Sequence, residues 1–421
     1  MKVAFLVNDL QLSGGVGVVV EHALRLSRLD GWEVTLVMVR EQEADVWHGY
    51  EQIESLHVRD AADAREEHYD IAIATWWETT FTLFEIPAAR YAYFVQSLED
   101  RFYRHDEAER LGAGLTLDLP VAFLTEAEWI RQTLAELRPD APCYLIRNGI
   151  DKAIFDPPER PPVRLSGPLR VLVEGSPHAW FKHLRGAIDA TAAMREPHHL
   201  TVVCGDREAL GEVPADEVLG PLSHREMADL YGRSDVVLKL SSVEGMFGPP
   251  LEGFHCGATC VVTPVTGYEE YIDHGWNGLL TDWDDLRGTA RQLDLLARDR
   301  QLLQFLRTNA LETARAWPSW DQSSQFMAAA LLKISEQPAP SSGAGAARLL
   351  SDLRGGLEIY SGHLLERSVY ASRAHRLERP LRRLAMTPPV RLVLALRRFR
   401  VVRLLARPLR PVTARVRRLA A

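Results

Sequence analysis

The stretch KVAFLVNDLQLSGGVGVVVEHALRLSRLDGWEVTLVMV, residues 2–39, holds the pattern that decides the fold. It begins with the apolar run Val3–Val7, passes through a glycine-rich turn at residues 13–17, and continues with apolar residues at helical spacing over Val18–Leu29. A second apolar run follows at residues 34–39. Strands that are apolar along their whole length are typical of parallel sheets covered by helices on both faces. This stretch therefore predicts a strand–helix–strand unit of an α/β fold.

The same alternation of strands and helices occurs in two series along the chain. In the first series, further strands are predicted at residues 71–74, 90–95, 121–124 and 143–146, with a helix at residues 126–137. In the second series, strands are predicted at residues 169–173, 200–203, 236–240 and 259–263, and helices at residues 184–194, 226–231, 249–256 and 286–309. Five prolines between residues 157 and 168 mark a linker between the series. Two doubly wound, Rossmann-like α/β domains are therefore expected.

The expected boundaries divide the 421 residues into four parts. The first domain is residues 1–160, and the second is residues 161–318. A helix within residues 319–336 is expected to return to the first domain. Residues 337–421 form a C-terminal extension, which begins with a segment rich in Pro, Ser, Gly and Ala.

Charge is distributed unevenly between this extension and the rest of the chain. Residues 373–421 contain fifteen arginines and one acidic residue, so they carry +14, whereas the rest carries −22 within a net charge of −8. A cationic segment gains roughly 1 kcal/mol per charge at an anionic membrane surface. We therefore expect the extension to bind such a surface, and the alternative is binding to the acidic body or to an acidic partner. Nucleic acid is not an expected partner, because no stacking platform accompanies the arginines.

Other features of the composition exclude several classes of protein. The four cysteines form no CxxC pair and the histidines have no metal-ligand spacing, so no disulfide framework, metal or other cofactor is expected. The apolar run at the N-terminus is too short for a signal sequence, and no apolar stretch is long enough to span a bilayer. These features predict a cytoplasmic protein.

The most informative motif is Glu244-Gly245-Met246-Phe247-Gly248-Pro249-Pro250-Leu251-Glu252. Two carboxylates flank a loop that opens a helix, with a proline suited to the first helical turn. Backbone N–H groups at such a helix start favour a diphosphate. A carboxylate in the first turn accepts ribose hydroxyls, and one in the preceding loop accepts hexose hydroxyls. The alternative is a pair of surface acids, one of them favourably placed near a helix start.

An ordered set of motifs resembles the family-4 retaining glycosyltransferases of the GT-B superfamily. The set consists of Gly14-Gly15, Arg147-Asn148-Gly149-Ile150-Asp151, Gly220-Pro221-Leu222-Ser223, the 244–252 motif, and Pro264-Val265-Thr266-Gly267-Tyr268-Glu269-Glu270. An ordered set is more specific than any single motif, and this one covers roughly residues 1 to 335. The resemblance implies that the two domains face each other across a cleft. The first domain then binds the acceptor and the second binds the nucleotide sugar.

Within the 244–252 motif, the resemblance implies a role for each polar group. Glu252 would bind the donor ribose and Glu244 the donor sugar. Gly245 lies in the same loop, and the amides of Met246, Phe247 and Gly248 would approach the phosphates. The family usually reads Glu-Gly-Phe-Gly-Leu-Pro, so the inserted methionine is a departure that affects the sugar pocket.

A second departure concerns the cations that bind phosphate. Glu174-Gly175-Ser176-Pro177 stands where the family usually has Gly-Arg, whereas Lys182 matches the family's lysine. Without an obligatory metal, cationic side chains and helix dipoles must stabilise the leaving diphosphate. We therefore expect Arg185, His178 or His183 to replace the missing arginine. The alternative for Lys182 is a solvated surface lysine.

The run Tyr93–Tyr103, YFVQSLEDRFY, resembles a bacterial subgroup implicated in rhamnose-containing polysaccharides and O-antigen-like glycans. Gln96 stands at a strand end where many family members have histidine. Because an amide accepts no proton at neutral pH, Gln96 is expected to hydrogen-bond the donor sugar. Glu99 is expected to orient the acceptor, and a polar strand end is the alternative. Phe102 and Tyr103 are expected to pack together with other aromatic rings.

Two further features lie near expected strand ends of the first domain. Gly14 and Gly15 are expected to allow a ligand close to the backbone. This loop lacks the full dinucleotide fingerprint, which argues against NAD. Of Trp76 and Trp77, we expect one in the core and the other at the cleft.

The sequence thus predicts a retaining glycosyltransferase of cell-surface glycan synthesis. It would move a hexose or deoxyhexose, from dTDP-rhamnose or another nucleoside-diphosphate sugar, to a saccharide or lipid-linked saccharide at the inner face of the membrane. The catalytic residues would be Glu244, Lys182 and Gln96. The substrate-binding residues would be Glu252, Gly14, Gly15, Gly245, Met246, Phe247, Gly248 and Glu99. The alternatives are a GT-B nucleotide-sugar epimerase and a non-catalytic carbohydrate-binding or assembly protein.

Overall fold

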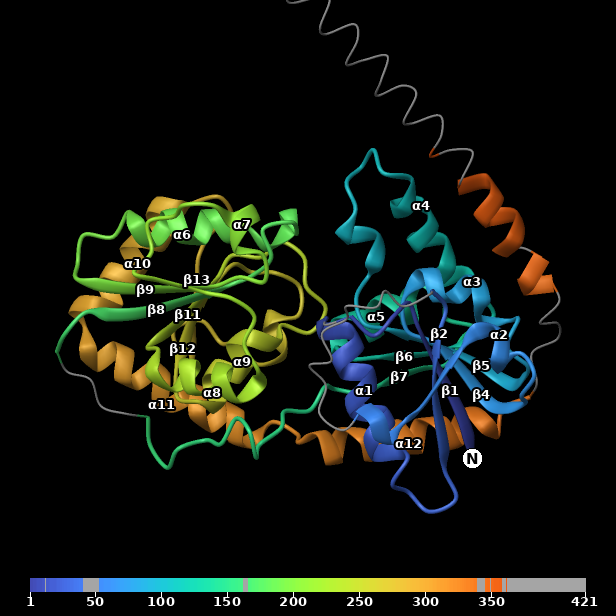
Figure 1. Cartoon of the computed structure of the whole chain (residues 1–421). Helices are drawn as coiled ribbons and strands as arrows, with labels where there is room; N and C mark the ends of the chain where they lie inside the picture. Colours follow the sequence, from blue (N-terminus) through green and yellow to red (C-terminus); the bar gives the residue numbers. More distant parts are fainter. Residues whose placement is uncertain are drawn as a thin grey trace, which may run out of the picture. The chain divides into compact units, whose positions relative to one another are not determined.

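The computed structural model describes residues 1–11, 13–40, 53–161, 166–338, 345–348, 350–357 and 361. Residues 1–104 and 109–353 form one compact unit that contains two parallel β-sheets (Figure 1). Residues 105–108 and 354–421 form a second unit, of which the structure describes 105–108, 354–357 and 361. The arginine-rich segment at residues 373–421 lies outside the described residues.

The first sheet has the strand order β3-β2-β1-β4-β5-β6-β7, and every neighbouring pair is parallel. Its strands are β1 (Lys2–Val7), β2 (Glu33–Met38), β3 (His57–Asp60), β4 (Tyr69–Ala74), β5 (Ala88–Val95), β6 (Ala122–Thr125) and β7 (Cys143–Leu145). The strand order reverses between β1 and β4, which is the topology of a doubly wound sheet.

The second sheet has the strand order β10-β9-β8-β11-β12-β13, again with parallel neighbours. Its strands are β8 (Leu169–Glu174), β9 (His198–Val203), β10 (Glu217–Leu219), β11 (Val236–Lys239), β12 (Thr259–Val262) and β13 (Gly278–Leu280). Here the order reverses between β8 and β11, and ligands of such sheets bind outside the carboxyl ends of the strands at this point.

Helices connect the strands in both sheets. The α-helices are α1 (Gly14–Leu26), α2 (Ala61–Ala64), α3 (Thr80–Leu83), α4 (Ala108–Leu115), α5 (Glu128–Leu137), α6 (Leu184–Ala192), α7 (Arg207–Leu210), α8 (His224–Arg233), α9 (Gly248–His255), α10 (Leu286–Arg298), α11 (Arg300–Ala316) and α12 (Trp320–Ser335). The 3₁₀ helices are η1 (Ile53–Ser55), η2 (Trp77–Thr79), η3 (Glu99–Phe102), η4 (Thr116–Asp118), η5 (Trp180–Lys182) and η6 (Tyr268–Glu270).

The prediction of two Rossmann-like α/β domains is confirmed. The sequence pattern missed β3, β10 and β13. All four residues of β3 are exposed, so this strand shows no apolar run. The strands β10 and β13 have three residues each, which is too short for a periodic signal.

Several predicted helix boundaries differ from the structure, and two of the differences are set by a capping side chain. The predicted turn at residues 13–17 is the start of α1, because the Ser13 hydroxyl accepts a hydrogen bond from the Val16 N–H and caps the helix. The predicted helix at residues 286–309 is two helices, α10 and α11. Asp299 separates them, since its carboxylate accepts from the N–H groups of Gln301 and Leu302 and begins the second helix.

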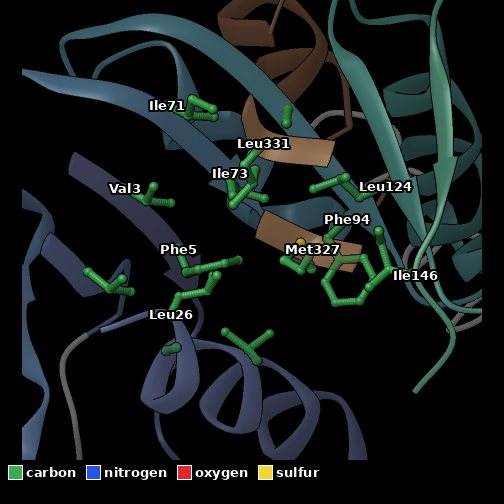
Figure 2. Close-up of a cluster of buried hydrophobic side chains, with 14 of the residues drawn as sticks. Val3, Phe5, Leu26, Ile71, Ile73, Phe94, Leu124, Ile146, Met327 and Leu331 are labelled. Carbon is green, nitrogen blue, oxygen red and sulfur yellow. The ribbon is translucent and has the colours of Figure 1, made fainter. Parts of the chain in front are cut away.

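The last helix, α12, packs against the first sheet. Met327 and Leu331 are fully buried in the same core as Phe5, Ile73 and Phe94 (Figure 2). A polar contact lies beside this core, where the ring nitrogen Nδ1 of buried His22 is 3.0 Å from the Ser324 hydroxyl. The helix after the second sheet is thus part of the core of the first.

The start of α12 also touches the chain that leaves β7. The Ile150 N–H donates to the Pro318 carbonyl at 3.1 Å. A Cβ atom on Gly149 would lie 2.3 Å from the Trp320 backbone nitrogen, so the close approach of these segments requires glycine. The chain passes between the two domains twice, after β7 and before α12, and these two connecting segments therefore contact each other.

Candidate active site

An ion pair with a buried lysine flanks the point of strand reversal in the second sheet. Glu174 ends β8 and Lys239 ends β11, and the Lys239 ammonium donates to the Glu174 carboxylate. Burial raises the pKa of Glu174, but the charges of Lys239 and Lys182 outweigh it and lower that pKa below its ordinary value. Burial lowers the pKa of Lys239, and nearby carboxylates, Glu174 first, outweigh this and raise it. Each charge thus keeps its partner ionised.

The Lys182–Glu244 pair lies beside this ion pair. Lys182 is the last residue of η5, and its Nζ atom is 2.8 Å from both carboxylate oxygens of Glu244. The Glu244 residue is only 7% exposed. The structure therefore brings together two residues that the sequence assigned to catalysis. We call Glu174, Lys182, Lys239 and Glu244 the strand-reversal charge cluster.

The three residues suggested as substitutes for the missing arginine have other partners. Arg185 donates to the carbonyls of Leu210 and Glu212 at 2.8 and 3.2 Å. The His178 ring nitrogen Nε2 is 2.8 Å from an Asp206 carboxylate oxygen. His183 alone is near the motif, with its Nε2 atom 3.2 Å from the hydroxyl of Ser242.

Lys239 is a cation that the sequence analysis missed. It is only 3% exposed, and its charge interacts with Glu174, Glu244 and Glu252. A lysine at the end of an otherwise apolar strand, VVLK, was the available signal. Lysine is rarely buried without a partner, so a lysine at the end of an apolar strand indicates a buried ion pair.

The loop before α9 differs from the expectation. The Met246 N–H donates to an oxygen of Glu126 at 2.8 Å, and the Gly248 N–H donates to the Met246 carbonyl at 3.0 Å. Two of the three amides expected to approach phosphates therefore have protein acceptors. The Phe247 side chain is fully buried in the core of the second domain. Any ligand contact of Phe247 would thus involve its backbone.

Glu252 lies in α9 but not in its first turn, which contains no acidic residue. The prediction of a first-turn carboxylate was wrong, because α9 begins at Gly248 and places Glu252 one turn further along. The carboxyl group of Glu252 lies near the hydroxyl of buried Tyr231. Burial raises the pKa of Glu252 above its ordinary value. The ribose-binding role of Glu252 stays a prediction.

In the first domain, Gln96 follows β5 directly. Its side-chain amide donates to the Thr75 carbonyl at 3.3 Å. A Cβ atom on Gly15 would lie 3.3 Å from the side-chain oxygen of Gln96, whereas one on Gly14 would meet no atom within 4 Å. The structure therefore places Gly15 against Gln96, and Gly14 beside open space.

Glu99 was expected to orient the acceptor, but it is buried, with 4% exposure. One oxygen accepts from the Trp77 N–H at 2.5 Å and from the Tyr93 hydroxyl at 2.9 Å. Burial raises the pKa of Glu99 well above its ordinary value. This carboxyl group joins the ends of β4 and β5, and the acceptor-orienting role of Glu99 stays a prediction.

Of the two tryptophans near Glu99, one lies in the core as expected, and a cleft position for the other stays a prediction. Trp77 is buried, and its indole N–H donates to the Tyr103 hydroxyl at 2.9 Å. Trp76 is partly exposed and stacks on Phe102, with ring centroids 5.8 Å apart. Phe102 also contacts Phe181 of the second domain, at 5.0 Å between centroids.

Glu126 is a second residue that the sequence analysis missed. It follows β6, is 5% exposed, and accepts from the Asn148 side-chain amide at 2.7 Å as well as from Met246. Burial raises the pKa of Glu126 to about 7, and the charge of Glu244 adds to the effect, although both hydrogen bonds oppose it. The sequence pattern predicted a helix that begins at Glu126, but α5 begins at Glu128.

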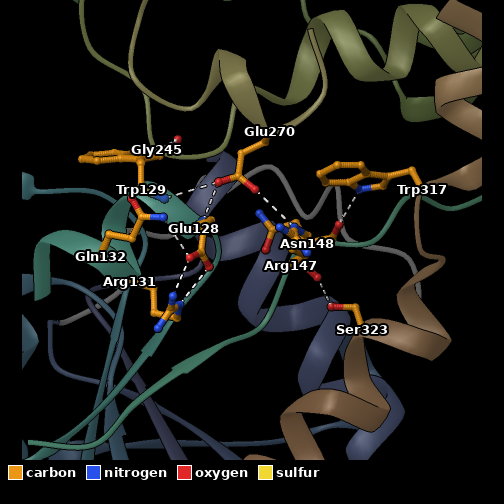
Figure 3. Close-up of polar contacts among 10 residues, drawn as sticks. All are labelled: Glu128, Trp129, Arg131, Gln132, Arg147, Asn148, Gly245, Glu270, Trp317 and Ser323. Carbon is orange, nitrogen blue, oxygen red and sulfur yellow. Dashed lines mark hydrogen bonds and ion pairs between the residues drawn. The ribbon is translucent and has the colours of Figure 1, made fainter. Parts of the chain in front are cut away.

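The two domains also meet at the start of α5. The Glu270 carboxylate accepts from the N–H of Glu128 at 2.5 Å and lies 3.2 Å from the Arg147 guanidinium (Figure 3). Ala127, the residue before α5, has no side chain that can cap the helix. Glu270 supplies this cap from the other domain, where a negative charge is favourable.

The described part of the chain contains no group of three or more His, Cys, Asp or Glu side chains arranged to hold a metal ion. Among the helices of the described residues, none has both the length and the apolar character that crossing a bilayer requires.

Comparison with known sequences gives two matches. Residues 168–299 match the family of group 1 glycosyl transferases. Over 98 residues, the chain is 35% identical to N-acetyl-alpha-D-glucosaminyl L-malate synthase from Bacillus anthracis. That match covers 23% of this chain and 26% of the relative, so it spans about a quarter of either protein.

Comparison with solved structures covers both domains. HepE (Alr3699) from Anabaena, solved in complex with UDP-glucose, matches with a TM-score of 0.64 at 16% identity, over 79% of this chain and 100% of that chain. Sucrose-phosphate synthase from Thermosynechococcus elongatus matches with a TM-score of 0.64 at 14% identity, over 79% of this chain and 98% of that chain. The chain therefore has the GT-B fold of two Rossmann-like domains, and its second domain matches the group 1 glycosyl transferases.

Proposed function

We propose that this protein is a retaining glycosyltransferase that moves a hexose or deoxyhexose from a nucleoside-diphosphate sugar to a saccharide or lipid-linked saccharide. The observation that carries the proposal is the position of the Lys182–Glu244 pair. This pair lies at the strand reversal of the second sheet, and the Glu244 carbonyl is 3.4 Å from the hydroxyl of Ser97, just after β5 of the first sheet. A donor held by one domain would therefore lie beside strand ends of the other.

The strand-reversal charge cluster supports the proposal of transfer without a metal. In the reaction we propose, the acceptor oxygen attacks the anomeric carbon on the face that the diphosphate leaves. The bond from that carbon to the phosphate oxygen breaks, and the acceptor proton passes to the leaving diphosphate. Lys182 would meet the negative charge that develops on this group, and Lys239 would add to the positive field. Glu244 would accept hydroxyls of the sugar.

The donor and the location are parts of the same proposal. HepE was solved with UDP-glucose, so UDP-sugars are tested beside dTDP-rhamnose, which we favour because residues 93–103 resemble the rhamnose-glycan subgroup. The fifteen arginines of residues 373–421 would bind the cytoplasmic face of the membrane, where a lipid-linked acceptor for cell-surface glycans would lie.

A thermal-shift screen of nucleoside diphosphates and their sugars tests the proposal, because a saturating ligand raises the apparent stability. We expect one nucleotide class to shift the transition, and transfer with that sugar to continue in EDTA. Glu252→Ala should weaken nucleotide binding by about 1–3 kcal/mol in calorimetry, through lost charge-assisted hydrogen bonds. Absence of any nucleotide shift would favour a non-catalytic binding protein. Conversion of the sugar without an acceptor would favour an epimerase.

A further inference from the structure

In the loop before α9 (residues 244–247), which we call the donor loop because of its proposed role, one peptide unit has both of its polar groups bound by the other domain. The Gly245 carbonyl accepts from the Trp129 indole N–H at 3.0 Å, and the Met246 N–H of the same peptide donates to Glu126 at 2.8 Å (Figure 3 shows Trp129 beside Gly245). Glu126 and Trp129 are three residues apart, in the segment that follows β6. A single short segment of the first domain therefore contacts both sides of this peptide.

The glycines around this peptide show how closely the domains approach. A Cβ atom on Gly245 would lie 1.8 Å from the Gln96 carbonyl oxygen and 2.7 Å from Glu126. A Cβ atom on Gly267 would lie 2.4 Å from the Gly245 carbonyl oxygen and 3.2 Å from the Trp129 indole nitrogen. Both positions accept only glycine without a shift of the backbone. Close contacts on both sides therefore restrict the position of the Gly245–Met246 peptide.

Trp129 and Glu126 are themselves held by neighbours. The Arg101 guanidinium lies 5.4 Å from the centre of the Trp129 ring system, a cation–π distance. The second oxygen of Glu126 accepts from Asn148, and the Asn148 carbonyl accepts from the Trp317 indole. Such support fixes the direction of both groups that contact the peptide.

We propose that Glu126 and Trp129 are positioning residues that fix the orientation of the Gly245–Met246 peptide, so that the sugar-binding part of the donor site is assembled only when the first domain contacts it. This inference rests on the proposed function, because it takes Glu244 and the loop after it as the site of the donor sugar. The peptide lies directly after Glu244, and a rotated peptide would move the Glu244 main chain. Glu252 lies one helical turn into α9, beyond these contacts.

If Glu126 and Trp129 position this peptide, their substitution should lower the turnover number but leave nucleotide affinity nearly unchanged. Trp129→Phe removes the indole N–H but keeps an aromatic ring, and Glu126→Ala removes the acceptor of the Met246 N–H. We expect each variant to bind UDP, or dTDP if the screen selects it, within about twofold of the wild type. The turnover number should fall roughly five- to tenfold, the size of one lost hydrogen bond. Glu126→Gln, which keeps an oxygen acceptor, should recover part of this loss.

Trp180→Phe is the matched control. The Trp180 indole N–H also donates to a backbone carbonyl of the other domain, that of Phe102, at 3.1 Å. This variant therefore removes the same kind of bond between the same domains but leaves the Gly245–Met246 peptide untouched. An equal fall in turnover in Trp180→Phe and Trp129→Phe would overturn the inference. It would show that turnover depends on contacts between the domains in general and not on the Gly245–Met246 peptide.

A second measurement does not depend on activity. The protein has seven methionines, so selective ¹⁵N-methionine labelling gives few amide signals, and Met246→Leu identifies the signal of Met246. We expect Glu126→Ala and Trp129→Phe to shift this signal and to speed its hydrogen exchange, whereas Trp180→Phe should leave it unchanged. An unchanged Met246 signal in both test variants would overturn the inference, even if the wild-type protein binds the nucleotide and transfers the sugar as proposed. The wild type could bind no nucleotide while the Met246 signal still shifts in the test variants. In that case the proposed function fails, but the positioning of the Gly245–Met246 peptide by Glu126 and Trp129 is supported.

Discussion

Carboxylates near the strand ends of the two sheets differ in their partners and in the direction of their pKa shifts. In the second domain, Glu174 and Glu244 each have a lysine partner, and the pKa of Glu174 falls below its ordinary value. In the first domain, Glu99 and Glu126 accept only hydrogen bonds from neutral groups, and burial raises the pKa of each. The lysine charges thus favour the ionised form of Glu174, whereas burial favours the neutral form of Glu99 and Glu126.

This difference fits the two substrates that we propose. A diphosphate carries charge, and a site that binds it needs fixed cations whose own charge is maintained by nearby carboxylates. An acceptor hydroxyl is neutral, and a carboxyl group of raised pKa is suited to hold a loop or a backbone without a counterion. Substituting glutamine for glutamate tests the comparison, because the same change should have very different effects in the two domains.

The largest effect is expected for Glu174→Gln. This change leaves the buried Lys239 ammonium without its charged partner, so the free energy of unfolding should fall by about 3 kcal/mol. Urea denaturation at pH 7 measures this loss. The double variant Glu174→Gln/Lys239→Met is the control, and it should regain most of the stability because no unpaired charge remains. A double variant as unstable as the single one would show that the pair does not act through charge.

An intermediate effect is expected for Glu126→Gln, and it should depend on pH. The pKa of Glu126 in the fold is about 7, above its ordinary value, so the folded state binds the proton more tightly than the unfolded state. The contribution of Glu126 to the free energy of unfolding should therefore decrease as the pH rises from about 4.5 to 7. The glutamine variant should lack this contribution, as urea denaturation across that range would show.

Glu128→Gln is the matched control for this pH dependence. The hydrogen bond from Arg131 lowers the pKa of Glu128 to about 2, so its contribution to stability is lost only as the pH falls below about 4.5. Between pH 4.5 and 7 this variant should have the same slope as the wild type. If Glu126→Gln leaves the slope of the unfolding free energy against pH unchanged, Glu126 has an ordinary pKa in the folded protein.

The smallest effect is expected for Glu99→Gln. Because burial disfavours the ionised form of Glu99, a neutral amide of the same shape keeps the acceptor for Trp77 and Tyr93. The free energy of unfolding at pH 7 should stay within about 1 kcal/mol of the wild type. Glu99→Ala, which removes the acceptor from two buried donors, should cost clearly more. A large loss in Glu99→Gln would mean that Glu99 needs its charge, and the contrast between the domains would fail.

Much of the fold could be predicted from the sequence because its signals are local. Continuous apolar runs identified strands of both sheets, and the proline cluster separated the two series. The motif at residues 244–252 and the lysine at 182 indicated two residues that do meet in the structure. Local pattern was weaker at the ends of elements, where a cap such as Ser13 or Asp299 decides the boundary.

The contacts that define the candidate site depend on pairs far apart in the chain. Lys239 and its partner Glu174 are separated by 65 positions, and Glu126 and Met246 by 120. No periodicity relates such residues, and only the strand order of each sheet and the approach of the two domains bring them together. The sequence by itself therefore determined the two doubly wound domains and the residue types of the donor loop. The tertiary structure alone decided which charges are paired and which peptide the other domain holds, because burial and pairing depend on neighbours in space.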